Sequence, residues 1–164
     1  MKTTIDYLKE RYAEEKSRFD HFENKSSKLL SFITVLIAAL TTLAGINSGK
    51  LLNPSGPIAW LALMTFFLGV FSIICAWGHA LLSLRVGDIP TMPKSRSTAE
   101  YLSAVDEDAK LQHIYNCYRD TLEELAISLD EKSINLELAY KELVISAWML
   151  GTTAALFIAT EITI

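Results

Sequence analysis

The sequence predicts an all-α integral membrane protein in which three transmembrane helices are joined to a cytoplasmic helical bundle or stalk. Three observations indicate this class. Hydrophobic residues make up 51% of the chain and the mean hydropathy is +0.27, and these residues gather in three long blocks. Lys and Arg are concentrated in two of the segments outside the blocks. The charged segments carry hydrophobic residues at helical spacing.

The three apolar blocks cover residues 29–46, 57–84 and 143–164. A helix needs about 20 mostly apolar residues to cross the hydrocarbon core of a bilayer. Three buried helices of a soluble domain are the alternative, but a chain of 164 residues has too little polar structure to surround them. A charged segment precedes the first block and no small-residue cleavage site stands out, so we expect a membrane span there and not a signal peptide.

The distribution of basic residues predicts the orientation of the spans, because cytoplasmic loops accumulate Lys and Arg. The connection at residues 47–56 holds only Lys50, and nothing basic follows Lys141. The other basic residues precede the first span or follow the second: Lys2, Lys9, Arg11, Lys16, Arg18, Lys25, Lys28, Arg85, Lys94, Arg96, Lys110, Arg119 and Lys132. We therefore expect residues 1–28 and 85–142 in the cytoplasm, and residues 47–56 and the C-terminus outside.

Residues 1–28 are expected to form one amphipathic helix that continues into the first span. No Gly or Pro occurs between Met1 and Thr42. Apolar residues alternate in steps of three and four, with Glu15 and Ser26 as polar interruptions. The members of this stripe are Ile5, Leu8, Tyr12, Phe19, Phe22 and Leu29.

Residues 85–142 are expected to contain a loop and then a long helix. Pro90 and Pro93 exclude helix near the end of the second span, and Ser97 with Glu100 has the spacing of a capping box. A helix from Ala104 to Ile164 would be about 90 Å long, so a stalk would project from the membrane unless the helix breaks at residues 130–133. Its apolar stripe is expected to pack against the stripe of the N-terminal helix. This stripe consists of Leu111, Ile114, Tyr118, Leu122, Leu125 and Leu129.

Small residues recur every four positions in the third span, at Gly151, Ala155 and Ala159. Such faces let transmembrane helices approach closely. The contact could lie within one subunit or between subunits, and the pattern fits the homo-oligomer that we expect.

The sequence does not predict an enzyme. The three histidines, His21, His79 and His113, are scattered and do not pair with Cys75 or Cys117 at metal-ligand spacing. There is no phosphate-binding loop and no nucleophile elbow. We expect no catalytic residue, metal, cofactor or nucleic-acid partner, and the spans carry almost no ionisable residues that would mark an ion relay.

The N-terminal helix carries a basic face that could bind a phosphate. Arg11, Arg18 and Lys25 are seven residues apart and so lie on one side of the helix, and Arg is the residue best suited to a bidentate contact with an anion. Alternatively, these residues form a positive collar at the membrane with surface pairs such as Glu14 with Arg18.

Residues 23–30 read E-N-K-S-S-K-L-L. This stretch resembles the acidic-x-Lys-small-Ser-x-Leu-Leu signature that opens the first span in Pycsar transmembrane effectors, and it is similar to the wider SLATT group of small membrane effectors. Asp is usual where this chain has Glu. The layout of helix, two spans, cytoplasmic section and final span is also similar. The matching positions are Glu23, Lys25, Ser27, Leu29 and Leu30.

The resemblance implies an antiphage role at the bacterial inner membrane. A partner cyclase makes a cyclic nucleotide during infection, the effector binds it, and the membrane is permeabilised. From charge and geometry we expect the phosphate contacts at Arg11, Arg18, Lys25 and Arg119, with Tyr118 or Tyr101 stacking on the base. A constitutive membrane scaffold or accessory subunit, whose stalk binds a protein partner, is the competing hypothesis.

Overall fold

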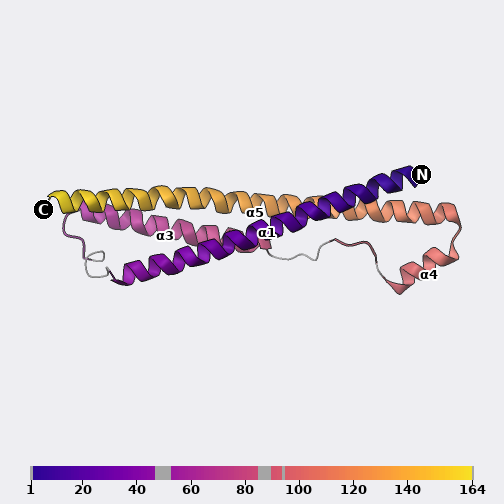
Figure 1. The fold of residues 1–164 in the computed structure, drawn as a ribbon, viewed down its shortest axis with the longest axis horizontal. Helices are drawn as coiled ribbons and strands as arrows, with labels where there is room; N and C mark the ends of the chain where they lie inside the picture. The colour runs from indigo at the N-terminus through magenta and orange to yellow at the C-terminus, as the bar shows by residue number, and fades with distance from the viewer. Residues whose placement is uncertain (1, 47–52, 85–89, 94, 164) are drawn as a thin grey trace. The chain divides into compact units, whose positions relative to one another are not determined.

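The computed structural model describes residues 2–46, 53–84, 90–93 and 95–163, most of which are in helices and none of which forms a strand. The elements are α1 (Lys2–Ile46), α3 (Pro57–Leu84), α4 (Arg96–Ala104) and α5 (Glu107–Thr163) (Figure 1). The prediction of an all-helical protein is confirmed. By length and composition, α1, α3 and α5 are each able to cross a membrane. Residues 47–52 of the predicted outside connection, and the basic residues Arg85 and Lys94, lie outside the described residues.

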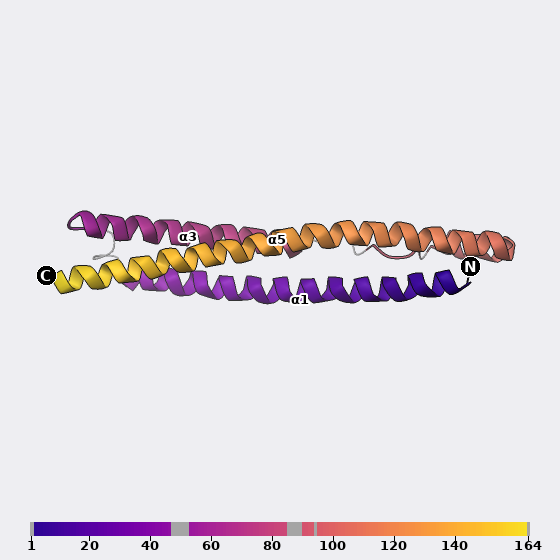
Figure 2. The same ribbon diagram turned by 90° about the horizontal axis from the view of Figure 1, so that it is seen from above.

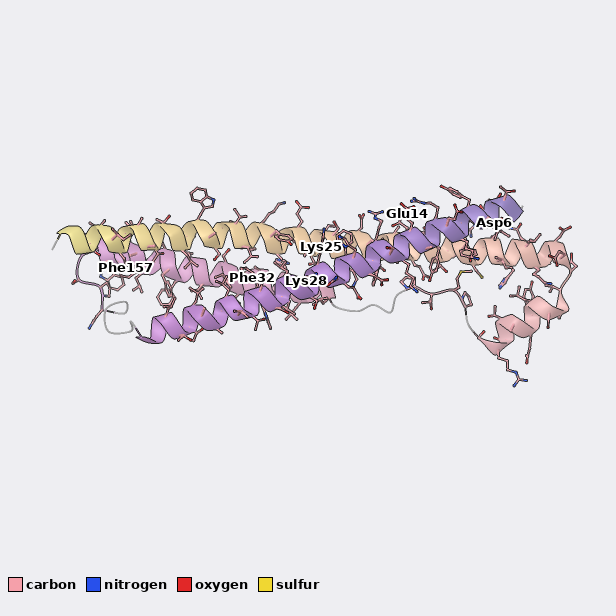
Figure 3. The ribbon with its side chains drawn as sticks, viewed as in Figure 1. Asp6, Glu14, Lys25, Lys28, Phe32 and Phe157 are labelled. Carbon is pink, nitrogen blue, oxygen red and sulfur yellow. The ribbon has the colours of Figure 1, made fainter. Side chains whose placement is uncertain are left out.

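The chain divides into two compact units. Unit 1 comprises Met1–Asn24 with Arg85–Ser133, and unit 2 comprises Lys25–Leu84 with Ile134–Ile164. Two of the helices, α1 and α5, contribute residues to both units. Along α1 the change falls between Asn24 and Lys25, just before the charged residues Lys25 and Lys28 and the apolar residues, such as Phe32, that follow them (Figure 3).

In unit 1, α1 and α5 run in the same direction and pack through their apolar stripes (Figure 2). The core cluster consists of the fully buried Phe19 and the buried Leu125 and Leu129, with Tyr12 and Phe22 packed against it. The predicted packing of the two stripes is therefore confirmed.

A lysine interrupts the stripe of α5. Lys132 lies seven residues after Leu125, on the same helix face, and is only 6% exposed. Its Nζ donates a hydrogen bond to Glu23 Oε1 at 3.2 Å and lies 4.2 Å from the centroid of the Phe19 ring. A buried ammonium needs such a partner, because an isolated charge is strongly disfavoured away from water. The helix continues through residues 130–133. The break that the sequence left possible there does not occur.

The start of α4 differs from the prediction. The N-cap is Ser95, whose hydroxyl accepts a hydrogen bond from the Thr98 main-chain N–H at 3.2 Å. The predicted cap at Ser97 is wrong, since its hydroxyl contacts Ser95 Oγ and the Glu100 carboxylate pairs with Arg96. The chain is extended at Val105, and α5 then begins at Glu107, so the helical segment that was expected to open at Ser97 is divided into α4 and α5.

In unit 2, α3 runs opposite to α1 and α5 (Figures 1 and 2) and packs through small residues. At Gly69, an added β-carbon would lie 3.1 Å from Leu150 Cγ and 3.3 Å from Met149 Cβ. Close approach of two helices at a glycine maximises their van der Waals contact. The buried small residues of α3 are Ala62, Gly69, Ser72, Ala76, Ala80 and Ser83.

The small residues predicted to form a helix-packing face on α5 are not part of this contact with α3. Gly151, Ala155 and Ala159 are exposed within unit 2, and a β-carbon added at Gly151 would meet no other atom within 4 Å. The close helix contact in this unit therefore occurs at Gly69, while the face containing Gly151 points away from it.

The packing at Gly69 predicts that a larger side chain is not tolerated there. Gly69→Leu should lower the thermal unfolding midpoint of the purified protein in detergent, because overpacking of this kind costs about 1–3 kcal/mol. Gly78→Leu on the same helix is the matched control, since a β-carbon at Gly78 has open space around it. Equal midpoints for the two variants would contradict the close packing.

The ion pair between Glu23 and Lys132 predicts that one substitution lowers the stability of unit 1 and that a second one restores it. Glu23→Gln should destabilise unit 1 by about 1–3 kcal/mol, because it weakens the bond to a buried charged group. Adding Lys132→Met should restore much of the loss, since both partners are then uncharged. Thermal unfolding of the single and double variants tests this, with Glu100→Gln as the control in an exposed pair. A double variant no more stable than Glu23→Gln would count against the pair.

Candidate functional site

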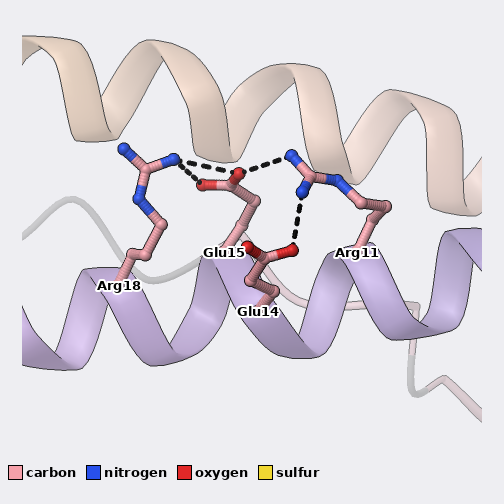
Figure 4. A network of polar contacts seen from close by, with 4 residues as sticks. All are labelled: Arg11, Glu14, Glu15 and Arg18. Atoms are coloured by element: carbon pink, nitrogen blue, oxygen red, sulfur yellow. Dashed lines mark hydrogen bonds and ion pairs between the residues drawn. The ribbon is translucent and has the colours of Figure 1, made fainter.

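The N-terminal part of α1 carries a network of four charged side chains (Figure 4). Arg11 donates to Glu14 Oε2 at 2.6 Å and to Glu15 Oε1 at 3.0 Å. From the other side, Arg18 Nη1 donates to Glu15 Oε2 at 2.9 Å. The two guanidinium groups thus flank the Glu15 carboxylate, which is the polar interruption in the apolar stripe.

Burial explains why this network forms. The Glu15 side chain is only 11% exposed, so its charge needs nearby cations, and Arg at positions i−4 and i+3 can reach it along one helix face. The predicted surface pair of Glu14 with Arg18 is wrong: Glu14 pairs with Arg11, and Arg18 with Glu15. In its contacts with Glu15, Arg18 uses only Nη1, and its side chain is 58% exposed.

The remaining candidate residues of unit 1 have partners of their own. Arg119 donates from Nε and Nη2 to Asp120 Oδ1 at 3.0 and 2.8 Å. The hydrogen bond to Asp120 raises the pKa of Arg119. Among the ion pairs of the described residues, the partner of Arg119 is Asp120, whereas Arg11 and Arg18 pair with glutamates of α1.

The two candidate tyrosines make edge-on ring contacts at different places. The Tyr118 ring lies 6.1 Å from that of Tyr12, whereas the Tyr101 ring of α4 lies 5.0 Å from His113. Lys25, the third basic residue at seven-residue spacing, belongs to unit 2 and is exposed. The structure thus brings Arg11 and Arg18 together around Glu15 and gives the other candidates separate surroundings.

The residues of the short sequence signature have different surroundings. In unit 1, the Glu23 carboxylate accepts the hydrogen bond from Lys132. In unit 2, Leu29 is buried, Leu30 is half-buried, and Lys25 and Ser27 are exposed. Two positions of the signature, Glu23 and Leu29, therefore have a clear packing role.

Few of the described side chains could bind a metal ion or act as a reactive thiol. No cluster of three or more His, Cys, Asp or Glu side chains within the described residues could hold a metal ion. Cys117 Sγ lies 3.6 Å from His113 Nε2, one turn apart on α5.

No family model, curated protein or solved structure matches this chain. The fold and the charged network define its class only as a helical protein with three helices able to span a membrane and an arginine–glutamate network on α1. The assignment of function therefore depends on the residues themselves.

Sequence reasoning missed Glu15 and Lys132 as members of the charged networks. A signal for Glu15 was present, because a carboxylate on an apolar stripe with Arg four residues before and three residues after it is suited to a buried ion pair. Lys132 lies seven residues after Leu125 on α5, but its partner Glu23 is far away in the sequence.

The network predicts that Glu15 competes with any anion that binds Arg11 and Arg18. Glu15→Gln should tighten the binding of cyclic mononucleotides to the purified protein, by up to about fivefold for an ion pair of 1 kcal/mol. Isothermal titration calorimetry measures the change. Glu100→Gln is the control, because this exposed carboxylate pairs with Arg96 and leaves the network on α1 intact. An unchanged or higher Kd for Glu15→Gln would exclude this pair of arginines as the anion site.

Proposed function

We propose that this chain is a membrane effector of an antiphage defence system, which senses a cyclic nucleotide through its cytoplasmic helices and permeabilises or depolarises the bacterial inner membrane. The observation that supports this most is the continuity of two helices. The α1 helix carries the arginine network near its start and an apolar segment at its end, and α5 likewise combines a charged segment with an apolar one. A change in helix packing near the network therefore has a direct route into the apolar segments.

Exposed apolar side chains support insertion of unit 2 into a bilayer. Trp148 is 73% exposed, Val35 69% and Phe71 64%. Side chains of this kind on three helices make an apolar surface that water disfavours and lipid solvates. With residues 1–28 and 85–142 in the cytoplasm, the basic segments follow the positive-inside rule.

Sensing requires a ligand that binds two packings of unit 1 with different affinity. The arginine network offers such a difference, because a nucleotide phosphate competes with the Glu15 carboxylate for Arg11 and Arg18. Displaced from the arginines, Glu15 would be a buried carboxylate without its cations, which disfavours the present packing of α1 against α5. The cyclic nucleotide would come from a partner cyclase, with Tyr118 or Tyr101 available to stack on the base.

Self-assembly in the membrane is part of this proposal. Gly151, Ala155 and Ala159 form a small-residue face on α5 that is exposed in unit 2. Faces of this type favour helix–helix association in lipid, so a second copy of the chain is the partner that we propose for this face, with membrane lipids around the assembly.

A constitutive scaffold or accessory subunit is the second candidate. One observation favours it: Ile127 of α5 is 58% exposed in unit 1, where a protein partner and not lipid would cover it. A scaffold of this kind would bind its partner without any nucleotide.

Membrane potential distinguishes the two functions. Cells that express the chain should depolarise only when supplied with the right cyclic mononucleotide, tested from a panel carrying each common ribonucleobase. The double variant Arg11→Gln with Arg18→Gln should lose the response and still insert, because it removes both arginines that would hold the phosphate and leaves the apolar segments unchanged. The matched control is Lys9→Gln with Lys16→Gln, two exposed basic residues on the same helix.

Each result has a defined meaning. No depolarisation of the wild type with any nucleotide would favour the scaffold over the effector. Depolarisation of the Arg11→Gln and Arg18→Gln double variant at an unchanged nucleotide dose would show that the phosphate binds elsewhere.

A further inference from the structure

A carboxylate lies between α3 and α5 in unit 2. Ser72 Oγ of α3 donates to Glu142 Oε2 at 2.5 Å and lies 3.1 Å from the main-chain carbonyl oxygen of Glu142. Ser72 is almost fully buried. In the sequence, Glu142 is the last charged residue before the third apolar block, and nothing in the local pattern indicates a partner for it on α3.

The position of Ser72 along α3 fixes the depth of this carboxylate in any membrane that α3 spans. The helix runs from Pro57 to Leu84, and a span takes about 20 residues. Every stretch of that length within α3 contains both Thr65 and Ser72. The Glu142 carboxylate, held on Ser72, therefore lies within the hydrocarbon layer in a membrane that α3 spans. The third span then begins before residue 143, and Glu142 belongs to it and not to the cytoplasmic segment.

Further hydroxyl groups continue the same contact between the helices. Thr65 Oγ1 lies 2.9 Å from Thr153 Oγ1, in hydrogen-bond contact across α3 and α5. Ser146 lies seven residues before Thr153, on the same face of α5, and is 2% exposed. We call this set the hydroxyl seam, and its members are Thr65, Ser72, Glu142, Ser146 and Thr153. The two cross-helix contacts are about 10 Å apart along α3.

Hydrogen bonds between hydroxyl groups are sufficient to hold transmembrane helices together, so packing alone does not require an acid at residue 142. A carboxylate at membrane depth is costly, and such residues usually mark the pathways of ions or protons. Carboxylates select cations in channels, and oxygen ligands replace part of the hydration shell of the ion. The hydroxyl seam supplies both kinds of group in one contact between two helices.

We propose that the hydroxyl seam is the ion path of the leak and that Glu142 makes this path select monovalent cations over anions. This inference rests on the proposed membrane-permeabilising function. When α3 and α5 separate, water and cations enter along the hydroxyl groups, and the Glu142 carboxylate repels anions at the membrane depth of Ser72.

Selectivity in liposomes tests the proposal. The full chain is reconstituted, a KCl gradient is applied, and the leak is started with the panel of cyclic mononucleotides. The wild type should pass K⁺ in preference to Cl⁻, and Glu142→Gln should lower the K⁺ to Cl⁻ permeability ratio by about fivefold or more. Glu142→Asp should retain the preference. Glu137→Gln is the matched control, because this exposed carboxylate pairs with Lys141 on the surface of the same helix and should not affect the ratio.

The outcomes separate the two proposals. A leak through Glu142→Gln with an unchanged permeability ratio overturns the role of Glu142 and leaves the proposed function intact. A wild type that never leaks overturns the proposed function and this inference with it.

Chemical accessibility gives a second readout that does not need the Glu142 variants to insert. Ser72→Cys, Thr153→Cys and Phe71→Cys are made in a chain with Cys75→Ala and Cys117→Ala, and cationic and anionic methanethiosulfonate reagents are added from the water phase. With nucleotide, the cationic reagent should modify the Ser72→Cys and Thr153→Cys variants at least about fivefold faster than the anionic one. Phe71→Cys should stay unmodified, because Phe71 is exposed on the lipid-facing surface of α3. Equal modification by both reagents, or none in a leaking sample, would overturn the path.

Discussion

The structure depends on one seven-residue repeat that runs along α5. A helix with this repeat keeps the same face toward its neighbours over many turns, and the face is buried in both units. Because the repeat has no interruption, the residues that pack in the charged segment and those that pack in the apolar segment share one line along the helix. The buried members of this line are Leu125, Lys132, Ala139, Ser146 and Thr153.

The polar side chains of the repeat have different kinds of binding partner in the two units. In unit 1, the Lys132 ammonium binds a carboxylate and an aromatic ring, whereas in unit 2 the Thr153 hydroxyl contacts the Thr65 hydroxyl. A buried polar group that has one suitable partner favours one register over its alternatives, as a buried polar residue does in a coiled coil. The α1–α5 register of unit 1 and the α3–α5 register of unit 2 are each marked by such a contact.

The sequence predicted the helices well because their signals are local. The apolar segment at 57–84 coincides with α3, and the stripes of three-and-four spacing identified the faces that meet at Phe19 and Leu125. Caps were predicted less well, since Ser95 and Ser97 are both plausible N-caps by residue type and only the backbone geometry selects Ser95. Contacts between distant helices could not be predicted. The close approach at Gly69 and the bond from Ser72 to Glu142 depend on the register of two helices, which no local pattern encodes.

The candidate site illustrates the same division between local and distant information. The seven-residue spacing of Arg11 and Arg18 correctly put both on one side of α1, but the functional meaning of that face depends on Glu15, whose burial against another helix makes its charge matter. An exposed carboxylate between two arginines would be a weak surface pair that salt screens. A buried one resists the loss of its cations, so an anion that binds the same arginines must work against the packing of α1. In the proposed function, that opposition would give a phosphate different affinities for two packings of the helices, and without such a difference a ligand could not shift the equilibrium between them.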